Sequence, residues 1–198
     1  NFVADTLQNE IFRHNPHIEI GAKFGRSVTA TYDKSPYGIK KSNQNKMHFM
    51  WGFIGDLNMT LNTQAVLSAF RPDIYVSDEE KADPPLKFDK PYWVFVSGGK
   101  SDYTAKIWDP LLWTQVVEQL SKDFVLVQVG GGSHKHPVIR NAYDLTGRTS
   151  FRELMRLIYH SHGVICIVTC LMHIAAGYNK PCVVIAGGRE PYTWEAYT

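Results

Sequence analysis

The feature that most constrains the fold is a series of nearly continuous apolar runs that begins after residue 90. Four such runs lie within residues 92–96, 123–129, 163–168 and 182–185, and residues 143–146 resemble a shorter strand. Strands without alternating polar positions are covered on both faces, as in parallel sheets. Between them, Pro110 suits a first helical turn, and Ser150 with Glu153 forms a capping-box pattern. This alternation predicts an α/β fold with a parallel sheet and right-handed crossovers.

Composition narrows the class of protein further. With 44% hydrophobic and 20% charged residues and a net charge of +2, the 198-residue chain has an ordinary globular composition and no general electrostatic attraction to nucleic acid. The three cysteines predict reduced thiols in a cytoplasmic protein. Cys166 and Cys170 have no second ligand pair at a zinc-like spacing, so we expect no metal. The apolar runs are too short to span a membrane, which leaves at most peripheral membrane contact.

The first 90 residues follow a different pattern. Helical spacing predicts helices over residues 5–14 and 47–70, with a short strand at 17–20. The charged stretch 77–90, which carries Pro84-Pro85, predicts an exposed linker between domains, with the linker proper at 81–90. The chain begins without Met and stops soon after the last strand. We therefore expect it to be part of a longer protein.

Candidate ligand-binding residues follow the strands, because parallel sheets bind ligands at the carboxyl ends of their strands. The loop from Gly98 to Lys106 can hold a diphosphate, with Lys106 as a point charge and Ser101 as a hydrogen-bond donor. It lacks the P-loop pattern, and a solvated turn is the alternative. Thr169 to His173 opens a helix after a strand, where free N–H groups can bind phosphate oxygens. His173 either donates to phosphate or holds the turn.

The glycine-rich turn 130–133 allows close approach of a ribose or adenine, although a plain flexible loop is equally compatible. His134 and His136 flank Lys135 in what we expect to be an exposed, solvated loop. General acid–base chemistry requires a positioned base, and the sequence shows none, so we assign no catalytic residue.

Three segments together resemble glycosyltransferase family 9, the heptosyltransferases of lipopolysaccharide synthesis. Residues 106–108 resemble the Lys-x-Trp of that family. Residues 145–154 resemble its Leu-x-Gly-x-[Thr/Met]-Ser-Leu-x-Glu segment. Residues 169–176, with 180–184, resemble its Asp-[Ser/Thr]-Gly-x-x-His-x-Ala-x-Ala signature and the Lys-Pro-Val-Val strand that follows. The order and spacing match from about residue 91 to the end.

The resemblance implies a GT-B architecture of two Rossmann-like domains. Residues 1–80 would then be the C-terminal part of an acceptor-side α/β domain, 81–90 the linker, and 91–198 a nucleotide-sugar-binding domain that is truncated here. Lys106 would contact the donor diphosphate, with Ser101 beside it, and Thr149 would line the adenine pocket. The phosphate-binding turn would comprise Thr169, Cys170, Leu171 and His173.

The resemblance also implies metal-independent transfer with inversion, without a cofactor. The donor would be a nucleotide-diphosphate sugar, most simply ADP-linked, and the acceptor a lipopolysaccharide or other glycan. The catalytic carboxylate would lie upstream of Asn1. The location would be cytoplasmic, at the inner face of a bacterial inner membrane.

Two positions depart from the family pattern: Val168 stands where the family has Asp, and Cys170 where it has Gly. Loss of the Asp removes a polar contact to the donor sugar. Two hypotheses therefore stay open. One is an inverting glycosyltransferase, and the other is a non-catalytic protein of the same fold that binds a nucleotide or glycan. The absence of G-x-G-x-x-G after a strand disfavours a dinucleotide-dependent oxidoreductase.

Overall fold

The structure is a computed structural model that describes residues 2–4, 9–20, 48–100, 106–186, 196 and 197. It divides the chain into two compact units, here called the sheet unit (residues 1–22 and 72–185) and the helix unit (residues 23–71 and 186–198). The stretch 81–90 lies inside the sheet unit, and the domain boundaries drawn from the sequence stay a prediction.

Five parallel strands form the centre of the sheet unit, in the order β5-β4-β3-β6-β7. Their bounds are β3 (Tyr92–Val96), β4 (Val125–Gln128), β5 (Tyr143–Asp144), β6 (Gly163–Ile167) and β7 (Cys182–Ile185). The central strand β3 pairs on both sides, with Val94 opposite Val127 of β4 and Val164 of β6. The predicted α/β class with a Rossmann-like parallel sheet is confirmed.

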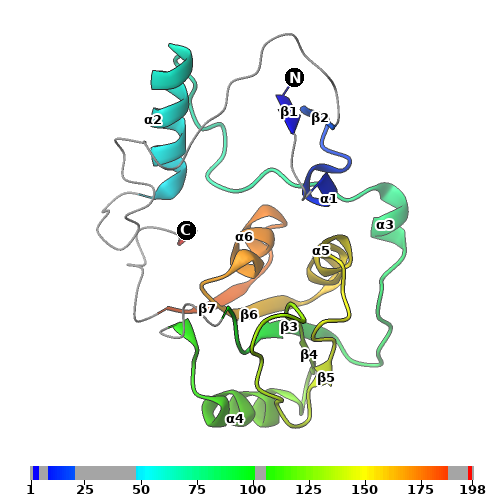
Figure 1. Ribbon diagram of the computed structural model, residues 1–198. Coiled ribbons are helices and arrows are strands. Elements are labelled where there is room, and N and C mark those ends of the chain that lie inside the picture. Colours follow the sequence, from blue (N-terminus) through cyan, green and yellow to red (C-terminus); the bar gives the residue numbers. More distant parts are fainter. Residues whose placement is uncertain (1, 5–8, 21–47, 101–105, 187–195, 198) are drawn as a thin grey trace. The chain divides into compact units, whose positions relative to one another are not determined.

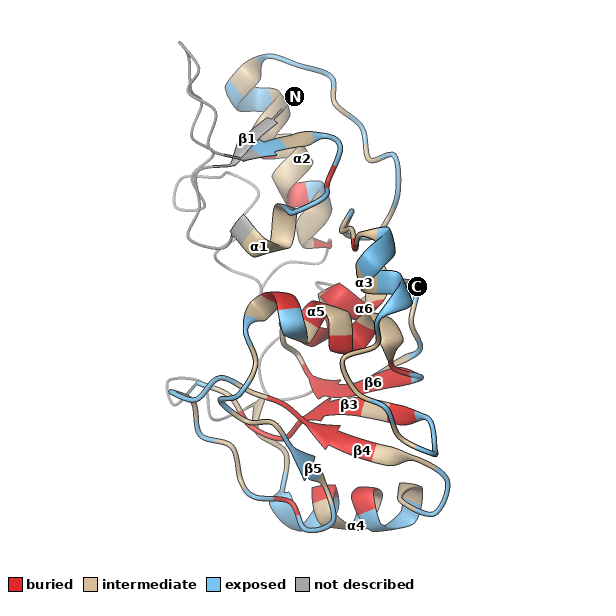
Figure 2. Cartoon of the chain, turned by 90° about the vertical axis from the view of Figure 1, so that its right-hand side faces the viewer, coloured by how far each residue is buried: buried red, intermediate tan, exposed pale blue. Residues whose placement is uncertain are grey.

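Helices cover both faces of this sheet, which explains the apolar runs. The helix α4 (Pro110–Leu120) lies on one face, and α5 (Phe151–His160) and α6 (Cys170–Gly177) lie on the other (Figure 1). The central strands are mostly buried (Figure 2). On the α4 side, the fully buried Trp113 packs against Phe95 of β3, with ring centroids 5.3 Å apart. Among the described residues, no helix has the length and apolar character needed to cross a bilayer.

The helices of the sheet unit begin where the sequence signals predict. In α4, Pro110 occupies the first turn, and the Asp109 carboxylate accepts a hydrogen bond from the Leu111 N–H at 2.8 Å. In α5, the predicted capping box is present. The Glu153 N–H donates to Ser150 Oγ at 3.2 Å, and the Ser150 N–H donates to Glu153 Oε2 at 2.7 Å. These caps fix where each helix leaves the edge of the sheet.

A short parallel strand pair lies near the N-terminus of the sheet unit. It comprises β1 (Phe2–Ala4) and β2 (Ile18–Ile20), and the helix α1 (Asn9–Phe12) lies between them in sequence. The predicted strand at 17–20 is confirmed. Within the described part of the predicted helix 5–14, α1 is shorter than expected. It ends before His14, whose φ of 66° is left-handed and cannot continue a right-handed helix.

The stretch 77–90 differs from the exposed linker that its charges predict, because it begins with a helix, α3 (Asp78–Ala82), held by its own capping box. Glu80 of α3 forms an ion pair with the buried Arg152 of α5, including a hydrogen bond from Nε to Oε1 at 2.8 Å. The Arg152 guanidinium lowers the pKa of Glu80 to about 2. At least one charged residue of this stretch, Glu80, therefore stabilises the fold instead of being solvated.

The helix unit contains α2 (Phe49–Leu61), which passes through Gly52 without a break. The predicted helix over 47–70 is too long at its C-terminal end. Asn62 adopts a left-handed conformation with φ 52°, and the Asn58 side chain accepts a hydrogen bond from the Ala65 N–H at 2.7 Å. The Asn58 side chain thus replaces a helical carbonyl as the acceptor for a backbone N–H, and the helix ends at this point.

We predict that the Glu80–Arg152 pair makes stability depend on pH. The folded pKa of Glu80 lies below its ordinary value of 4.5. The pair therefore stabilises the fold above that pH, and its contribution is lost as pH falls from about 4.5 towards 2. Glu80→Gln should lower the free energy of unfolding at pH 7 by about 3 kcal/mol, because it removes the negative charge that compensates a buried guanidinium. Urea unfolding at several pH values measures this.

The control is Asp78→Asn on the same helix, where the carboxylate is 92% exposed. Its ion pair with Lys81 is exposed, so the substitution should change stability far less than Glu80→Gln does. A Glu80→Gln deficit that stayed constant down to pH 2 would contradict the assignment.

Candidate donor-binding pocket

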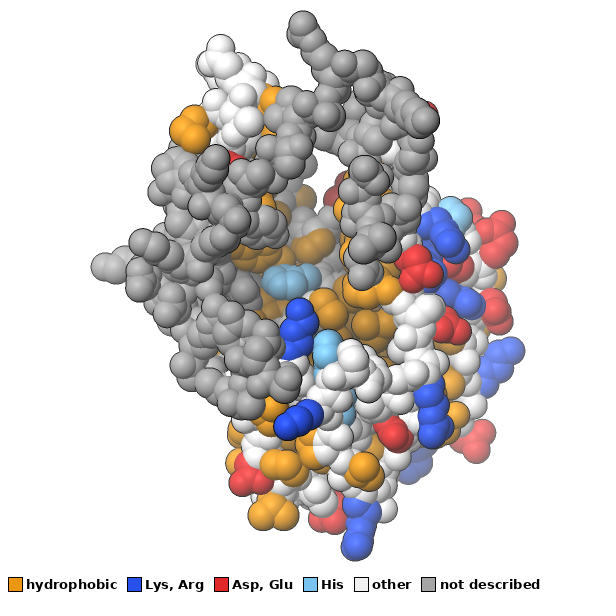
Figure 3. All heavy atoms as spheres, in the orientation of Figure 1, with side chains coloured by type: hydrophobic (Ala, Val, Ile, Leu, Met, Phe, Trp, Pro, Cys, Tyr) orange, Lys and Arg blue, Asp and Glu red, His pale blue; other side chains and the backbone are white. Residues whose placement is uncertain are grey.

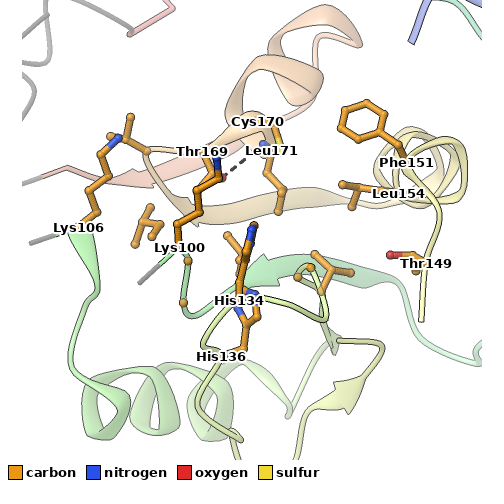
Figure 4. A pocket seen from close by; sticks show the side chains of 18 of the residues that line it. Lys100, Lys106, His134, His136, Thr149, Phe151, Leu154, Thr169, Cys170 and Leu171 are labelled. Carbon is orange, nitrogen blue, oxygen red and sulfur yellow. Dashed lines mark hydrogen bonds between the residues drawn. The ribbon is translucent and has the colours of Figure 1, made fainter. Parts of the chain in front are cut away.

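A pocket of about 560 Å³ opens at the carboxyl ends of β3, β4 and β6, within the sheet unit. This volume is in the range of sites that hold a molecule the size of a nucleotide. The loop after β3, the loop after β4 and the starts of α5 and α6 form its walls (Figure 4). The lining residues on which the following paragraphs depend are Lys100, Lys106, His134, His136, Phe151 and Thr169.

A two-residue antiparallel bridge ties the loops after β3 and β4 to each other. The Gly99 N–H donates to the Lys135 carbonyl and the Lys135 N–H donates to the Gly99 carbonyl, each at 3.1 Å. The loops approach so closely at Gly98 that a Cβ there would stand 2.0 Å from the Lys135 carbonyl oxygen. The first glycine of the pair thus allows backbone contact between the loops, and the bridge fixes that corner of the pocket.

Two helices begin at the pocket, but their positive ends differ in what already surrounds them. At α5, the Ser150 N–H donates to the Glu153 carboxylate and the Arg152 N–H donates to the Glu10 carboxylate at 3.0 Å. The first turn of α6, all of whose residues are described, contains no acidic residue. Its N-cap is Thr169, whose Oγ1 accepts a long hydrogen bond of 3.4 Å from the Leu171 N–H. The start of α6 is therefore the better place for an anion.

Two lysines add positive charge around the pocket, and two histidines add further polar groups. Lys100 and Lys106 lie on the α6 side in the close-up view, and His134 and His136 stand on the loop after β4 (Figure 4). Among the described residues that line the pocket, none is Asp or Glu. Basic and histidine side chains lie beside an apolar surface on the face shown in Figure 3. This combination suits a ligand with both an anionic and an apolar part.

The apolar part of the lining comes from the strand ends and from the starts of α5 and α6. Phe151 and Leu154 line one side of the pocket, and Leu171 lies at the start of α6 (Figure 4). Thr149, just before the α5 cap, places a hydroxyl beside this surface. A flat heterocycle can bury its faces here while a charged group lies near Lys106 and Thr169.

Most of the residues predicted for the site lie together in this pocket. Those that line it are Lys106, Thr149, Thr169, Cys170 and Leu171. His173 does not line it and is half-buried further along α6. Ser101 lies outside the described residues. The binding roles of all seven stay predictions.

The sequence interpretation missed part of the lining. His134 and His136 were expected in a solvated loop, but both face the pocket while Lys135 between them is exposed. The alternation of His, Lys and His could have indicated this arrangement, since neighbouring residues of an extended segment point to opposite sides. The sequence could not identify Phe151 and Leu154 as pocket residues, because an apolar residue of an amphipathic helix is equally expected in the hydrophobic core.

The three cysteines are free thiols. The sulfur atoms of Cys166 and Cys182 lie 4.0 Å apart on neighbouring strands. In the part of the chain that the structure describes, no group of three or more His, Cys, Asp or Glu side chains is arranged to hold a metal. Metal independence stays a prediction.

We predict that Gly98 and Gly99 respond differently to the same substitution. In Gly98→Ala the new methyl meets backbone atoms of Lys135 and His136. The loops must separate, which should cost about 1–3 kcal/mol of unfolding free energy. In Gly99→Ala the nearest atom is Ile167 Cδ1 at 3.8 Å, an ordinary contact, so the change should stay within about 0.5 kcal/mol. Urea unfolding of both variants compares them, and equal midpoints would count against the bridge.

Comparison with solved structures shows the same fold in glycosyltransferases. The dodecameric iron-containing glycosyltransferase TibC from enterotoxigenic E. coli H10407 matches with a TM-score of 0.63 and 20% identity, over 95% of this chain and 49% of that one. The E. coli ADP-heptose lipopolysaccharide heptosyltransferase II matches with a TM-score of 0.53 and 21% identity, over 67% and 43%. E. coli heptosyltransferase WaaC with ADP matches with a TM-score of 0.52 and 16% identity, over 73% and 47%.

The match therefore covers less than half the length of each of these proteins, and at these identities it establishes the fold. The GT-B type expected from the sequence is confirmed. No curated protein sequence matches the chain. The family model described as "Glycosyltransferase family 9 (heptosyltransferase)" matches residues 63–198, which is more than half of the chain. The chain belongs to glycosyltransferase family 9.

Proposed function

We propose that this chain forms the donor-binding part of a glycosyltransferase that transfers a sugar from a nucleotide-diphosphate sugar to a glycan acceptor. The observation that carries the proposal is the pocket at the strand ends. It combines the start of α6, which has no acidic first-turn residue, with Lys100 and Lys106, and it places an apolar surface beside them. A nucleotide diphosphate has the matching parts: an anion and a flat heterocycle.

We further propose an ADP-linked donor, with heptose or a related sugar as the group transferred and lipopolysaccharide as one acceptor. The structures with a similar fold support this choice. One is named an ADP-heptose lipopolysaccharide heptosyltransferase, another was solved with ADP, and TibC was solved in complex with ADP-D-beta-D-heptose. Family membership supports sugar transfer in general.

The proposed chemistry depends on the leaving diphosphate. Sugar transfer breaks the bond between the anomeric carbon and the diphosphate oxygen, and the electron pair of that bond leaves with the diphosphate. Negative charge therefore grows near Lys106 and the N–H groups at the start of α6, where preorganised donors stabilise it most. The acceptor hydroxyl loses its proton to a base, and we assign no residue to that role.

A second candidate function rests on Val168, which lines the pocket at the position where the family pattern has Asp. A valine side chain cannot hydrogen-bond a sugar hydroxyl. The same fold would then serve as a non-catalytic nucleotide- or glycan-binding protein. Sugar transfer by the longer protein would decide for the enzyme, whereas nucleotide binding without transfer would decide for the binding protein.

We predict that ADP stabilises this chain against thermal unfolding. A ligand that binds only the folded state at a hundredfold excess over its Kd stabilises it by about 2.7 kcal/mol. The midpoint should therefore rise in a thermal-shift assay with ADP or an ADP-sugar, and less with UDP or GDP compounds. If none of these compounds shifts the midpoint, the proposed function is wrong for this chain.

We predict that Lys106→Ala weakens ADP binding. Loss of a charge-assisted hydrogen bond costs about 1.5–3 kcal/mol, or roughly 10- to 150-fold in Kd. Calorimetric titration with ADP measures the loss. Lys122→Ala is the matched control, because Lys122 follows α4, is exposed, and bonds to Gln119 rather than lining the pocket. If the two variants bind ADP with equal affinity, Lys106 does not contact the ligand.

A further inference from the structure

Hydrogen bonds hold the backbone on both sides of His136, on the loop after β4. On one side, Lys135 is bridged to Gly99 by the hydrogen-bond pair described above. On the other side, the Pro137 carbonyl accepts a hydrogen bond from Gln128 Nε2 at 2.8 Å and a longer one from Ser97 Oγ at 3.3 Å. Gln128 and Ser97 are both buried. The residue between these two anchors has a fixed backbone position at the pocket wall.

The imidazole ring of His136 packs over Gly130, where a Cβ would stand 2.3 Å from its Cε1 and Nε2 atoms. Both ring nitrogens are buried, and neither meets the geometry of a hydrogen bond to a described residue, although the Gly131 backbone lies close enough to act on the pKa of the ring. Buried polar atoms in native proteins are nearly always paired, with protein, water or ligand. A ring whose backbone is fixed in a pocket wall, and whose nitrogens bond to no other side chain, can bind a ligand through them.

The surroundings keep this ring uncharged near neutral pH. Burial lowers the pKa of His136, and the nearby His134 ring lowers it further. The Gly131 carbonyl and the Asp144 carboxylate act in the opposite direction without overcoming burial. A neutral imidazole presents one N–H donor and one acceptor. That pair matches a hydroxyl or the edge of a heterocyclic base, whereas a diphosphate, which is acceptor-only, fits Lys106 and the start of α6.

We propose that His136 binds the nucleoside part of the donor through its ring nitrogens, and so helps to select the nucleotide. This inference rests on the proposed function. The nitrogens lie just beneath the pocket surface, and a ligand reaches them when the ring turns about its side-chain bonds. No well-formed hydrogen bond to a described residue opposes that turn. Pairing with the ligand then offsets the cost of leaving two buried polar atoms unsatisfied.

The test compares two ligands that share the anion but not the nucleoside. His136→Ala should weaken ADP binding about five- to tenfold, the loss of one or two neutral hydrogen bonds. Binding of inorganic pyrophosphate should change less than about twofold, which is within ordinary variation between neutral variants. Lys106→Ala should weaken both ligands. His136→Gln, which keeps a donor and an acceptor, should recover part of the ADP affinity.

Lys135→Ala is the matched control, because its side chain is exposed outside the pocket and its backbone bridge is retained. It should bind ADP as the unchanged chain does. Thermal unfolding of each variant confirms folding. Should His136→Ala fail to fold, the ring ¹⁵N chemical shifts of His136 in the unchanged chain serve instead. They should move on addition of ADP and stay in place on addition of pyrophosphate.

The outcomes separate the two proposals. If the unchanged chain binds no nucleotide, the proposed function and this inference both fail. If ADP binds but His136→Ala binds it equally well, or the ring shifts stay in place with ADP, the role of His136 is wrong and the proposed function stands. If His136→Ala weakens pyrophosphate as much as ADP, the ring contacts the anion and the nucleoside assignment is overturned.

Discussion

The parallel pairing of β3 with strands on both of its sides is the constraint on which the rest of the structure depends. Strands that all point the same way must be joined by crossovers, so helices cover both faces and most positions of the central strands are buried. The same direction places the carboxyl ends of β3, β4 and β6 at one edge. The loops that follow these strands meet there, and the pocket lies between them.

Helix starts at this edge serve two different purposes, and the surrounding charges decide which. The start of α5 is occupied by Glu153 and Glu10, and Arg152 in its first turn is paired with Glu80. These interactions hold α5 to α1 and α3, and so stabilise the wall that carries Phe151. The start of α6 has no such carboxylate in its first turn. The positive end of the helix dipole thus binds carboxylates of the protein at α5. At α6 the first turn has no carboxylate of its own, which favours binding of an anion there.

Much of the sheet unit could be predicted because its signals are local or periodic. The strands of the sheet, the Ser150–Glu153 cap and the position of Lys106 after β3 needed only the residues around them. Other features are long-range. The ion pair that anchors α3 joins Glu80 to Arg152, 72 residues apart, and the charge of α3 by itself resembles a solvated linker. In the same way, the residues near His136 in sequence do not indicate that Gly99, 37 positions earlier, forms a backbone bridge to its loop.

The sequence by itself determined the class of fold, the edge of the sheet where the pocket lies, and the family pattern with its departures at Val168 and Cys170. Burial on both faces, turn chemistry and motif spacing depend on residues that are close together in the sequence. They can therefore be predicted without knowing which distant residues meet. Only the tertiary structure decided that His136 faces the pocket, that His173 stands away from it, and that α5 begins among carboxylates of other segments. Those facts depend on which distant backbone and side-chain groups meet, and hydrogen-bond satisfaction is a property of the assembled fold.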